Sequence, residues 1–123
     1  MKLSPKAAGT FAIAPTPFFD DGRIDEASID RLTDFYAEVG CDGVTVLGIL
    51  GEAPKLEAAE AEAVATRFVK RAGSKMQIIV GVSSPGFAAM RSLARASMDA
   101  GAAGVMIAPP PNLRTDDQIT SYF

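Results

Sequence analysis

Four short apolar segments alternate along the chain with longer segments in which apolar residues recur every three or four positions. Short β-branched runs that end at glycine or proline predict buried strands, whereas the longer periodic segments predict amphipathic helices. Strands are expected at 9–16, in the first part of 44–52, at 77–82 and in the last part of 101–107. The alternation therefore predicts repeated βα units.

The segment 26–39 is the first predicted helix. Asp25 can cap its start, because an aspartate oxygen accepts hydrogen bonds from the free amides of a first turn. Gly40 ends the helix, since glycine tolerates the left-handed conformation of a C-terminal cap. The residues expected to face inward are Ile29, Leu32, Tyr36 and Val39.

The second predicted helix begins at Glu57. Val64, Phe68 and Val69 fall on its inner side. Its acidic residues gather at the start and its basic residues at the end, an order that suits the helix dipole. These charges are expected to form a solvated face.

Two more helices are predicted from their caps. Ser83–Pro85 is expected to cap the third helix, with proline in the first turn. The segment Thr115–Gln118 is a capping box that opens a fourth helix. The residues expected to face inward from the third helix are Met90, Leu93, Ala94, Ser97 and Met98.

Residues 101–107 repeat the pattern of residues 40–46, in which a glycine closes a helix and a second glycine precedes a branched strand. The two copies lie 61 positions apart. This spacing corresponds to two βα units of about 30 residues each. Four such units, with strands buried on both faces, predict a parallel α/β architecture.

A closed (β/α)8 barrel needs eight such units and roughly 250 residues. The 123 residues are therefore expected to be the N-terminal half of a single (β/α)8 TIM barrel domain, supplying about the first four βα units. An open doubly wound sheet of the flavodoxin type is the rival, because it could be complete at this length. That fold usually has five strands, whereas this chain ends within its fourth predicted helix.

The second predicted strand runs into the turn Gly48-Ile49-Leu50-Gly51-Glu52. A glycine turn directly after a buried strand lets backbone amides come close to a ligand. Because sites in parallel α/β barrels form from the loops that follow the strands, we expect a small molecule to bind here. The alternative is that the glycines only make a tight connection from strand to loop.

The charge and composition exclude several classes of partner. A net charge of −3 and a sequence pI near 4.8, without a basic cluster, argue against nucleic acid and against an anionic membrane surface. No apolar stretch is long enough to span a bilayer, and residues 1–14 lack the pattern of a secretory signal. A cytoplasmic protein is therefore expected.

The chain has no histidine and a single cysteine. Without histidine, Ser-His and Cys-His nucleophiles and the zinc helix motif are excluded. Cys41, between Gly40 and a strand, is expected to be a small buried residue rather than a nucleophile. The acidic residues show no spacing typical of a metal site, so neither a metal nor a cofactor is expected.

The motifs, taken in order, resemble the start of the dihydrodipicolinate synthase and N-acetylneuraminate lyase family, whose members are Schiff-base class I lyases on a (β/α)8 barrel. The resemblance covers nearly the whole chain from Gly9. The matching pieces are Pro15–Phe18, Asp21–Asp25, Gly48–Glu52, Leu56, Gly81 and Ala108–Asn112.

The resemblance implies a lyase, aldolase or dehydratase that acts on pyruvate or a related 2-oxo acid through a lysine imine, without a cofactor. It also implies a homo-oligomer, either a dimer or a tetramer. In the family, the glycine turn offers its amides and hydroxyls to the carboxylate of the 2-oxo acid. The substrate-binding positions that it implies here are Thr16, Gly48, Ile49, Leu50, Gly51, Glu52 and Pro111.

The chain departs from the family where hydroxyl groups are expected. Ile49 and Leu50 stand where the family commonly has Thr-Thr or Ser-Thr, and Pro111 stands where the synthases have a tyrosine of a proton relay. The backbone amides of the turn do not depend on these side chains, so carboxylate binding is expected to persist. The hydroxyl relay is replaced, so the dihydrodipicolinate reaction is expected to be poor.

No catalytic residue is expected within the chain, because the resemblance places the lysine and the catalytic tyrosine on later strands, beyond Phe123. Lys55 lies near the presumed site, but Glu57 and Glu60 would keep its amine protonated, so a surface role is expected. Glu52 could be a general acid or base; the favoured interpretation is a carboxylate that bonds loop amides and fixes the turn. The alternative to an enzyme is a non-catalytic, ligand-binding family member or an inactive half barrel without the imine lysine.

Overall fold

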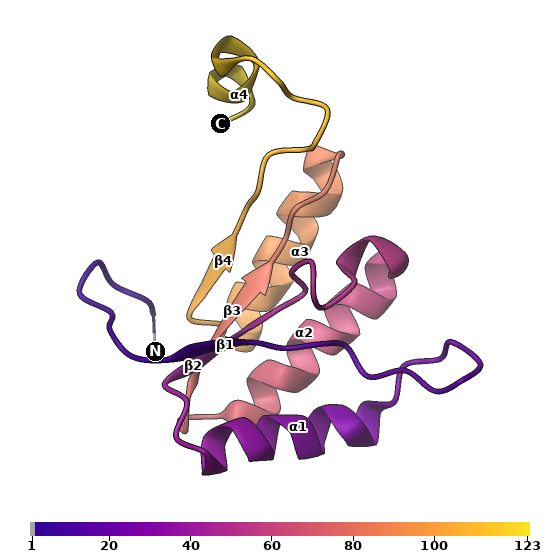
Figure 1. The fold of residues 1–123 in the computed structure, drawn as a ribbon, viewed down its shortest axis with the longest axis vertical. Helices are drawn as coiled ribbons and strands as arrows, with labels where there is room; N and C mark the ends of the chain where they lie inside the picture. Colours follow the sequence, from indigo (N-terminus) through magenta and orange to yellow (C-terminus); the bar gives the residue numbers. More distant parts are fainter. Residues whose placement is uncertain (1) are drawn as a thin grey trace.

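The computed structural model describes residues 2–123, which form a parallel sheet of four strands (Figure 1). The strands are β1 (Phe11–Ile13), β2 (Gly43–Val46), β3 (Gln77–Gly81) and β4 (Gly104–Met106). Neighbours pair in chain order, and every pair is parallel. All predicted strands are therefore confirmed, although each is shorter than the segment that predicted it.

A helix follows each strand. The helices are α1 (Glu26–Glu38), α2 (Ala58–Ala72), α3 (Phe87–Ala100) and α4 (Asp116–Tyr122), and a 3₁₀ turn, η1 (Ala53–Lys55), precedes α2. Helix α1 packs on α2, and α2 packs on α3, along one face of the sheet, while α4 lies beyond the end of β4 (Figure 1). Tyr122 of α4 stacks on Phe87 of α3, with the ring centroids 5.5 Å apart. A doubly wound sheet reverses its strand order and has helices on both faces. That alternative is therefore wrong, and the chain has four βα units of the barrel type.

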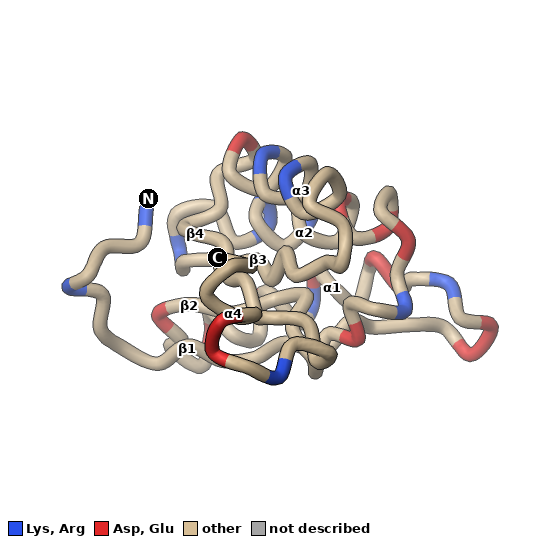
Figure 2. The backbone as a smooth tube through the Cα atoms, turned by 90° about the horizontal axis from the view of Figure 1, so that it is seen from above, with Lys and Arg blue, Asp and Glu red and all other residues tan. Residues whose placement is uncertain are grey.

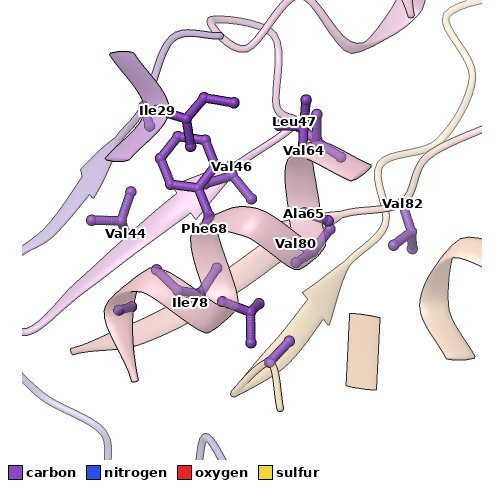
Figure 3. Close-up of a cluster of buried hydrophobic side chains, with 14 of the residues drawn as sticks. Ile29, Val44, Val46, Leu47, Val64, Ala65, Phe68, Ile78, Val80 and Val82 are labelled. Atoms are coloured by element: carbon purple, nitrogen blue, oxygen red, sulfur yellow. The ribbon is translucent and has the colours of Figure 1, made fainter. Parts of the chain in front are cut away.

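The hydrophobic core lies between these helices and the sheet (Figure 3). Val44, Val46 and Val80 of the strands meet Ile29 of α1 and Phe68 of α2, and each of these side chains is at most 1% exposed. Because successive strand residues point to opposite faces, the residues between these valines point away from the helices. The prediction that α2 faces inward through Val64, Phe68 and Val69 is confirmed.

The inner side of α1 differs from the prediction at its C-terminal end. Ile29 is buried as expected, but Val39 lies after the last helical residue and is 58% exposed. Thr33 takes a buried position instead, because its Oγ1 donates to the carbonyl of Ile29 at 2.7 Å and the hydroxyl is not left unpaired. The predicted cap is confirmed, since the Ser28 amide donates to Asp25 Oδ1 at 2.9 Å.

Helix α3 begins later than predicted. Its first residue is Phe87, and its N-terminal cap is Gly86 rather than the segment 83–85. Ser83 is not free to act as a cap, because its Oγ accepts a hydrogen bond from the Ala108 amide at 2.8 Å. The inner residues of α3 are confirmed; these are the buried Met90 and Ser97, with Leu93, Ala94 and Met98 packed against the core.

The predicted cap at Thr115 is confirmed, whereas the predicted burial of Cys41 is wrong. Thr115 caps α4 as predicted, and Gln118 completes the capping box. Cys41, in contrast, is only half-buried. It lies in the connection between α1 and β2, where its neighbours Gly40 and Asp42 are exposed. A side chain in such a connection has packing on one side only.

Arginines of α2 bind acidic residues of α1 along the line where the two helices meet. Arg67 donates to both carboxylate oxygens of Asp30, at 2.9 and 2.8 Å, and to Glu26 at 2.6 Å. Arg71 pairs in the same bidentate way with Asp34. The prediction of a purely solvated face is therefore wrong for these two arginines, which hold α1 against α2.

Elsewhere, Figure 2 shows acidic and basic positions interspersed along the chain rather than gathered by sign. Within residues 2–123, every helix is too short or too polar to cross a bilayer.

The ion pairs between α1 and α2 predict a loss of stability in acid. Hydrogen bonds from Arg67 and Arg71 hold the pKa values of Asp30 and Asp34 below the ordinary value of 3.8 in the folded chain. A carboxylate whose pKa is lower in the folded state stabilises that state above its unfolded pKa, and the contribution is lost as the pH falls through the folded pKa. We expect the thermal midpoint of unfolding to fall between about pH 5 and about pH 3 for this reason.

The double variant Asp30→Asn, Asp34→Asn should show a smaller fall of the midpoint over the same range, measured by circular dichroism. The control Asp99→Asn removes an exposed carboxylate of α3 and should keep the wild-type slope. A double variant with the same slope as the wild type would contradict this account.

Candidate functional site

The loops that follow the four strands lie at one end of the sheet, because parallel strands present their carboxyl ends to the same side. This end carries Thr16, the turn 48–52, Ser83 and the segment 109–112. The prediction of a parallel sheet is confirmed, and this arrangement brings these segments to the same end. The hydrogen bonds of the structure bring two of the predicted site residues, Thr16 and Gly51, into direct contact.

Thr16 ties the loop after β1 to the turn after β2. Its side chain is only 7% exposed, and its Oγ1 donates to the carbonyl of Gly51 at 2.6 Å. The hydroxyl is thus engaged with the backbone of the turn. The bond links the turn to the segment that follows the first strand.

The turn after β2 is bounded by two residues in the left-handed region. Leu47 has a φ of 56° and Glu52 a φ of 54°. This conformation costs a residue with a side chain about 1–2 kcal/mol. Between them the chain folds back on itself, so closely that a Cβ at Gly51 would lie 2.9 Å from the nitrogen of Leu47. Backbone strain of this kind persists only where neighbouring contacts hold it, and it is common in binding loops.

Gly81 of β3 supports the same turn from the neighbouring strand. A Cβ at position 81 would clash with the carbonyl oxygen of Leu47 and lie 2.9 Å from its carbonyl carbon. Only glycine therefore leaves room for the bend that starts the turn. The sequence motif included Gly81, but the bend itself has no local signal, because leucine rarely adopts a positive φ.

Within residues 2–123, the amides of Gly48, Ile49, Leu50 and Gly51 in the turn have no protein acceptor. The Glu52 amide, in contrast, closes the turn by donating to the Ile49 carbonyl at 3.0 Å. The side chains of Ile49 and Leu50 are 97% and 54% exposed. Successive free amides on a fixed turn can donate to an anion such as a carboxylate.

The carboxylate of Glu52 does not bond the loop amides, so that prediction is wrong. Its Oε1 accepts a hydrogen bond from Lys55 Nζ at 3.3 Å instead. The reason is local, because Glu52 caps η1 and Lys55 is the last residue of that turn, three positions later. The Lys55 side chain is 70% exposed, in agreement with the surface role predicted for it.

Pro111 lies in the connection between β4 and α4. Its side chain is exposed, and the chain turns there because the Leu113 amide donates to the Pro110 carbonyl at 3.1 Å. Figure 1 shows this connection as an extended arm that rises beyond the sheet and carries α4. The arm is fixed at its base by Ser83, whose Oγ accepts from the Ala108 amide. The sequence pattern predicted that Ser83 caps a helix. It did not indicate the bond from Ala108 to Ser83, because a bond between two separate loops has no local pattern.

Two open hollows of the surface lie away from this end of the sheet. One lies between α1 and α2 around Arg67 and Lys70, and the other lies near the amino ends of the strands around Cys41 and Lys75. Neither hollow includes a residue of the turn. Within residues 2–123, no three cysteine, aspartate or glutamate side chains gather closely enough to hold a metal ion. The turn after β2 is therefore the candidate site on the basis of its backbone.

Comparisons with known proteins agree with this fold. The model of the dihydrodipicolinate synthetase family matches residues 6–123. A crystal structure of dihydrodipicolinate synthase from Rhodopseudomonas palustris is 84% identical with a TM-score of 0.94, over 99% of this chain and 40% of that one.

Two curated relatives are named 4-hydroxy-tetrahydrodipicolinate synthase. The protein of Sorangium cellulosum is 38% identical over 104 residues, which are 84% of this chain and 35% of the relative. The protein of Nitrosococcus oceani is 31% identical over 116 residues, which are 94% of this chain and 40% of the relative. The chain thus spans at most about two fifths of the length of these relatives.

Proposed function

Because this chain belongs to the dihydrodipicolinate synthetase family, we propose that it supplies the carboxylate-binding part of a lyase or aldolase that acts on pyruvate or a related 2-oxo acid through a lysine Schiff base. The observation that carries the proposal is the fixed turn after β2, whose amides at Ile49, Leu50 and Gly51 have no acceptor within residues 2–123. The turn lies at the carboxyl end of the strand, where sites on parallel α/β barrels form.

The amides of Ile49, Leu50 and Gly51 bind the carboxylate without help from side chains. Hydrogen bonds from amides to an ionised acceptor are stronger than those between neutral groups. The turn is already held by Thr16 and Gly81, so little conformational freedom is lost on binding. The anchored carboxylate then fixes the position of the carbonyl carbon next to it.

Imine formation joins a lysine nitrogen to that carbonyl carbon and releases the carbonyl oxygen as water. In an aldol cleavage, the bond between C3 and C4 then breaks, its electrons pass into the protonated imine, and C4 leaves as an aldehyde after its hydroxyl proton goes to a base. The enamine that remains takes a proton at C3, and water releases pyruvate. The resemblance places this lysine beyond Phe123. Lys55 is unsuited, because its exposed ammonium is paired with Glu52.

The proton relay of the synthases has no counterpart in this half of the site. Ile49 and Leu50 carry only hydrocarbon, and Pro111 has no hydroxyl. The hydroxyl of Thr16 is engaged with Gly51. We therefore propose that condensation of pyruvate with aspartate semialdehyde is slow, while binding of the 2-oxo acid is retained.

The remaining parts of the proposal follow from the family. Residues 1–123 are the first half of a single (β/α)8 barrel domain, and the second half supplies the imine lysine. The full-length protein that contains this chain is a cytoplasmic homo-oligomer, a dimer or a tetramer, and it requires no cofactor.

Reductive trapping tests the proposed function. The full-length protein, treated with pyruvate and borohydride, should gain the mass of pyruvic acid less one oxygen atom, measured by mass spectrometry. Acetone has the same ketone without a carboxylate, so it should be trapped about 10-fold less efficiently, or worse, because it cannot use the amides of the turn. Equal trapping of acetone would contradict the role of the turn, and the absence of any pyruvate adduct would contradict the Schiff base.

A further inference from the structure

We propose, on the premise of the function above, that Thr16 is a positioning residue that favours substrates with a carboxylate without touching them. Its hydroxyl holds the peptide unit between Gly51 and Glu52. That unit sets the direction of the free amides that precede it in the turn. Thr16 therefore raises the selectivity for 2-oxo acids over ketones that lack the carboxylate.

The Thr16 hydroxyl is not free to bind a carboxylate. It has a single hydrogen, which it donates to the carbonyl oxygen of Gly51 at 2.6 Å. The lone pairs that remain on Oγ1 are acceptors, and an anion offers them no hydrogen. The side chain is also only 7% exposed, so a substrate cannot reach it without displacing its neighbours. An effect of Thr16 on the carboxylate therefore passes through Gly51.

The peptide unit between Gly51 and Glu52 is held on both of its sides. Its carbonyl oxygen accepts the hydrogen bond from Thr16, and its amide donates to the Ile49 carbonyl at 3.0 Å. Because a peptide unit is planar, bonds on its two sides keep it from rotating. Glu52 has a φ of 54°, and a residue with a side chain keeps such a conformation only where its surroundings hold it.

The segment that carries the hydroxyl is itself rigid. Thr16 lies between Pro15 and Pro17. A proline ring fixes its own φ and restricts the residue before it to extended conformations. The Pro17 carbonyl also accepts a hydrogen bond from the amide of Asp25, the cap of α1, at 3.0 Å. Thr16 is therefore a fixed point against which the turn is positioned.

The free amides of the turn depend on this support. Only the two torsion angles of Gly51 separate its free amide from its held carbonyl, and glycine restricts these angles less than any other residue. Without the Thr16 bond, the amides of Leu50 and Gly51 can turn away from a common direction. Successive amides bind an anion well only when they point to one place.

The test is reductive trapping of the full-length protein with pyruvate and with acetone at equal concentration. Thr16→Val keeps the shape of the side chain and removes the hydroxyl. It should lower the ratio of pyruvate to acetone trapping by about 5-fold or more, the lower end of the effect of leaving a buried carbonyl without its donor. Thr16→Ser keeps the hydroxyl and should keep the ratio within about 2-fold of the wild type. Thr16→Ala gives the same comparison if the valine variant does not fold.

Thr33→Val is the matched control, because it removes the same kind of bond from α1. Thr33 is 1% exposed, and its Oγ1 donates to the Ile29 carbonyl at 2.7 Å. This variant should leave the ratio within about 2-fold of the wild type. The inference is overturned if the hydroxyl-free variants of Thr16 keep the wild-type ratio, or if Thr16→Ser or Thr33→Val lowers it as much as they do.

Hydrogen exchange of the protein without ligand separates positioning from direct contact. In Thr16→Val, the Glu52 amide should exchange about 5-fold faster than in the wild type, because its peptide unit is then held on one side only. A lower trapping ratio with unchanged exchange would mean that the hydroxyl binds the carboxylate directly, and the inference would be wrong.

Failure of the proposed function gives a different result. A wild type that forms no adduct, or that traps pyruvate and acetone equally, overturns the proposed function and this inference together. A wild type that prefers pyruvate, with the same preference in Thr16→Val, overturns only the role of Thr16.

Discussion

Replacing Gly81 by alanine is expected to destabilise the full-length protein by about 3 kcal/mol, the upper part of the usual range for overpacking. The added Cβ would clash with the carbonyl oxygen of Leu47, and the carbonyl carbon would lie 2.9 Å away. These are backbone atoms of a bend with a positive φ, so they cannot move aside as the end of a flexible side chain could. The clash must therefore move either the strand or the turn.

The measurement is the thermal midpoint of unfolding, compared with that of Gly86→Ala. Gly86 has no heavy atom within 4 Å of the position that a Cβ would take, and its φ of −97° suits any residue. The control Gly86→Ala should lower the free energy of unfolding by less than about 1 kcal/mol, as expected for alanine in place of glycine at a helix cap. Equal midpoints for the two variants would show that Gly81 does not hold the turn.

The isolated 123-residue chain is expected to associate rather than to remain a stable monomer. The sheet has two open edges, at β1 and β4, and it exposes Ile13 and Met106 on the face away from the helices. Open strand edges and uncovered apolar side chains favour pairing with another chain. Sedimentation of the isolated chain should therefore show dimers or larger species at micromolar concentration.

Ile13→Lys should shift the isolated chain towards monomer, because it places a charge on an edge strand. Phe19→Lys is the matched control, since Phe19 is 47% exposed, like Ile13 at 48%, but lies in the loop after β1. It should leave the association unchanged. A compact monomer with cooperative unfolding in the unmodified chain would contradict the expectation.

Local patterns were sufficient for most of the fold. The apolar runs predicted the four strands, and the caps at Asp25 and Thr115 lie where the sequence indicated. These features depend on residues within a few positions of each other. The ordered motifs extended the prediction to a barrel of eight units, which hydrophobic periodicity alone could not distinguish from an open sheet.

The errors arise where a distant contact decides the local structure. Ser83 holds the loop after β4 instead of capping α3. Arg67 crosses to Asp30 on another helix, so it is not part of a solvated face. None of these partners can be identified from spacing along the chain.

For the candidate site, the sequence predicted the position of the turn rather than the contacts of its side chains. The turn 48–52 follows β2 as predicted, and Thr16 lies beside it. The side-chain role given to Glu52 was wrong, because a left-handed backbone at that position and the following 3₁₀ turn bring Lys55 within its reach. The bend at Leu47, with its positive φ, needs the space that Gly81 leaves on the neighbouring strand, so it could be found only in the structure.

The measurement that tests the central claim most directly is peptide mapping of the protein trapped with pyruvate and borohydride. This chain is proposed to anchor the carboxylate through backbone amides and to contribute no imine nitrogen. The adduct should therefore lie on a single lysine beyond Phe123, and every peptide from residues 2–123 should have its unmodified mass. An adduct on Lys55, or a trapped protein in which no lysine after Phe123 is modified, would contradict the account.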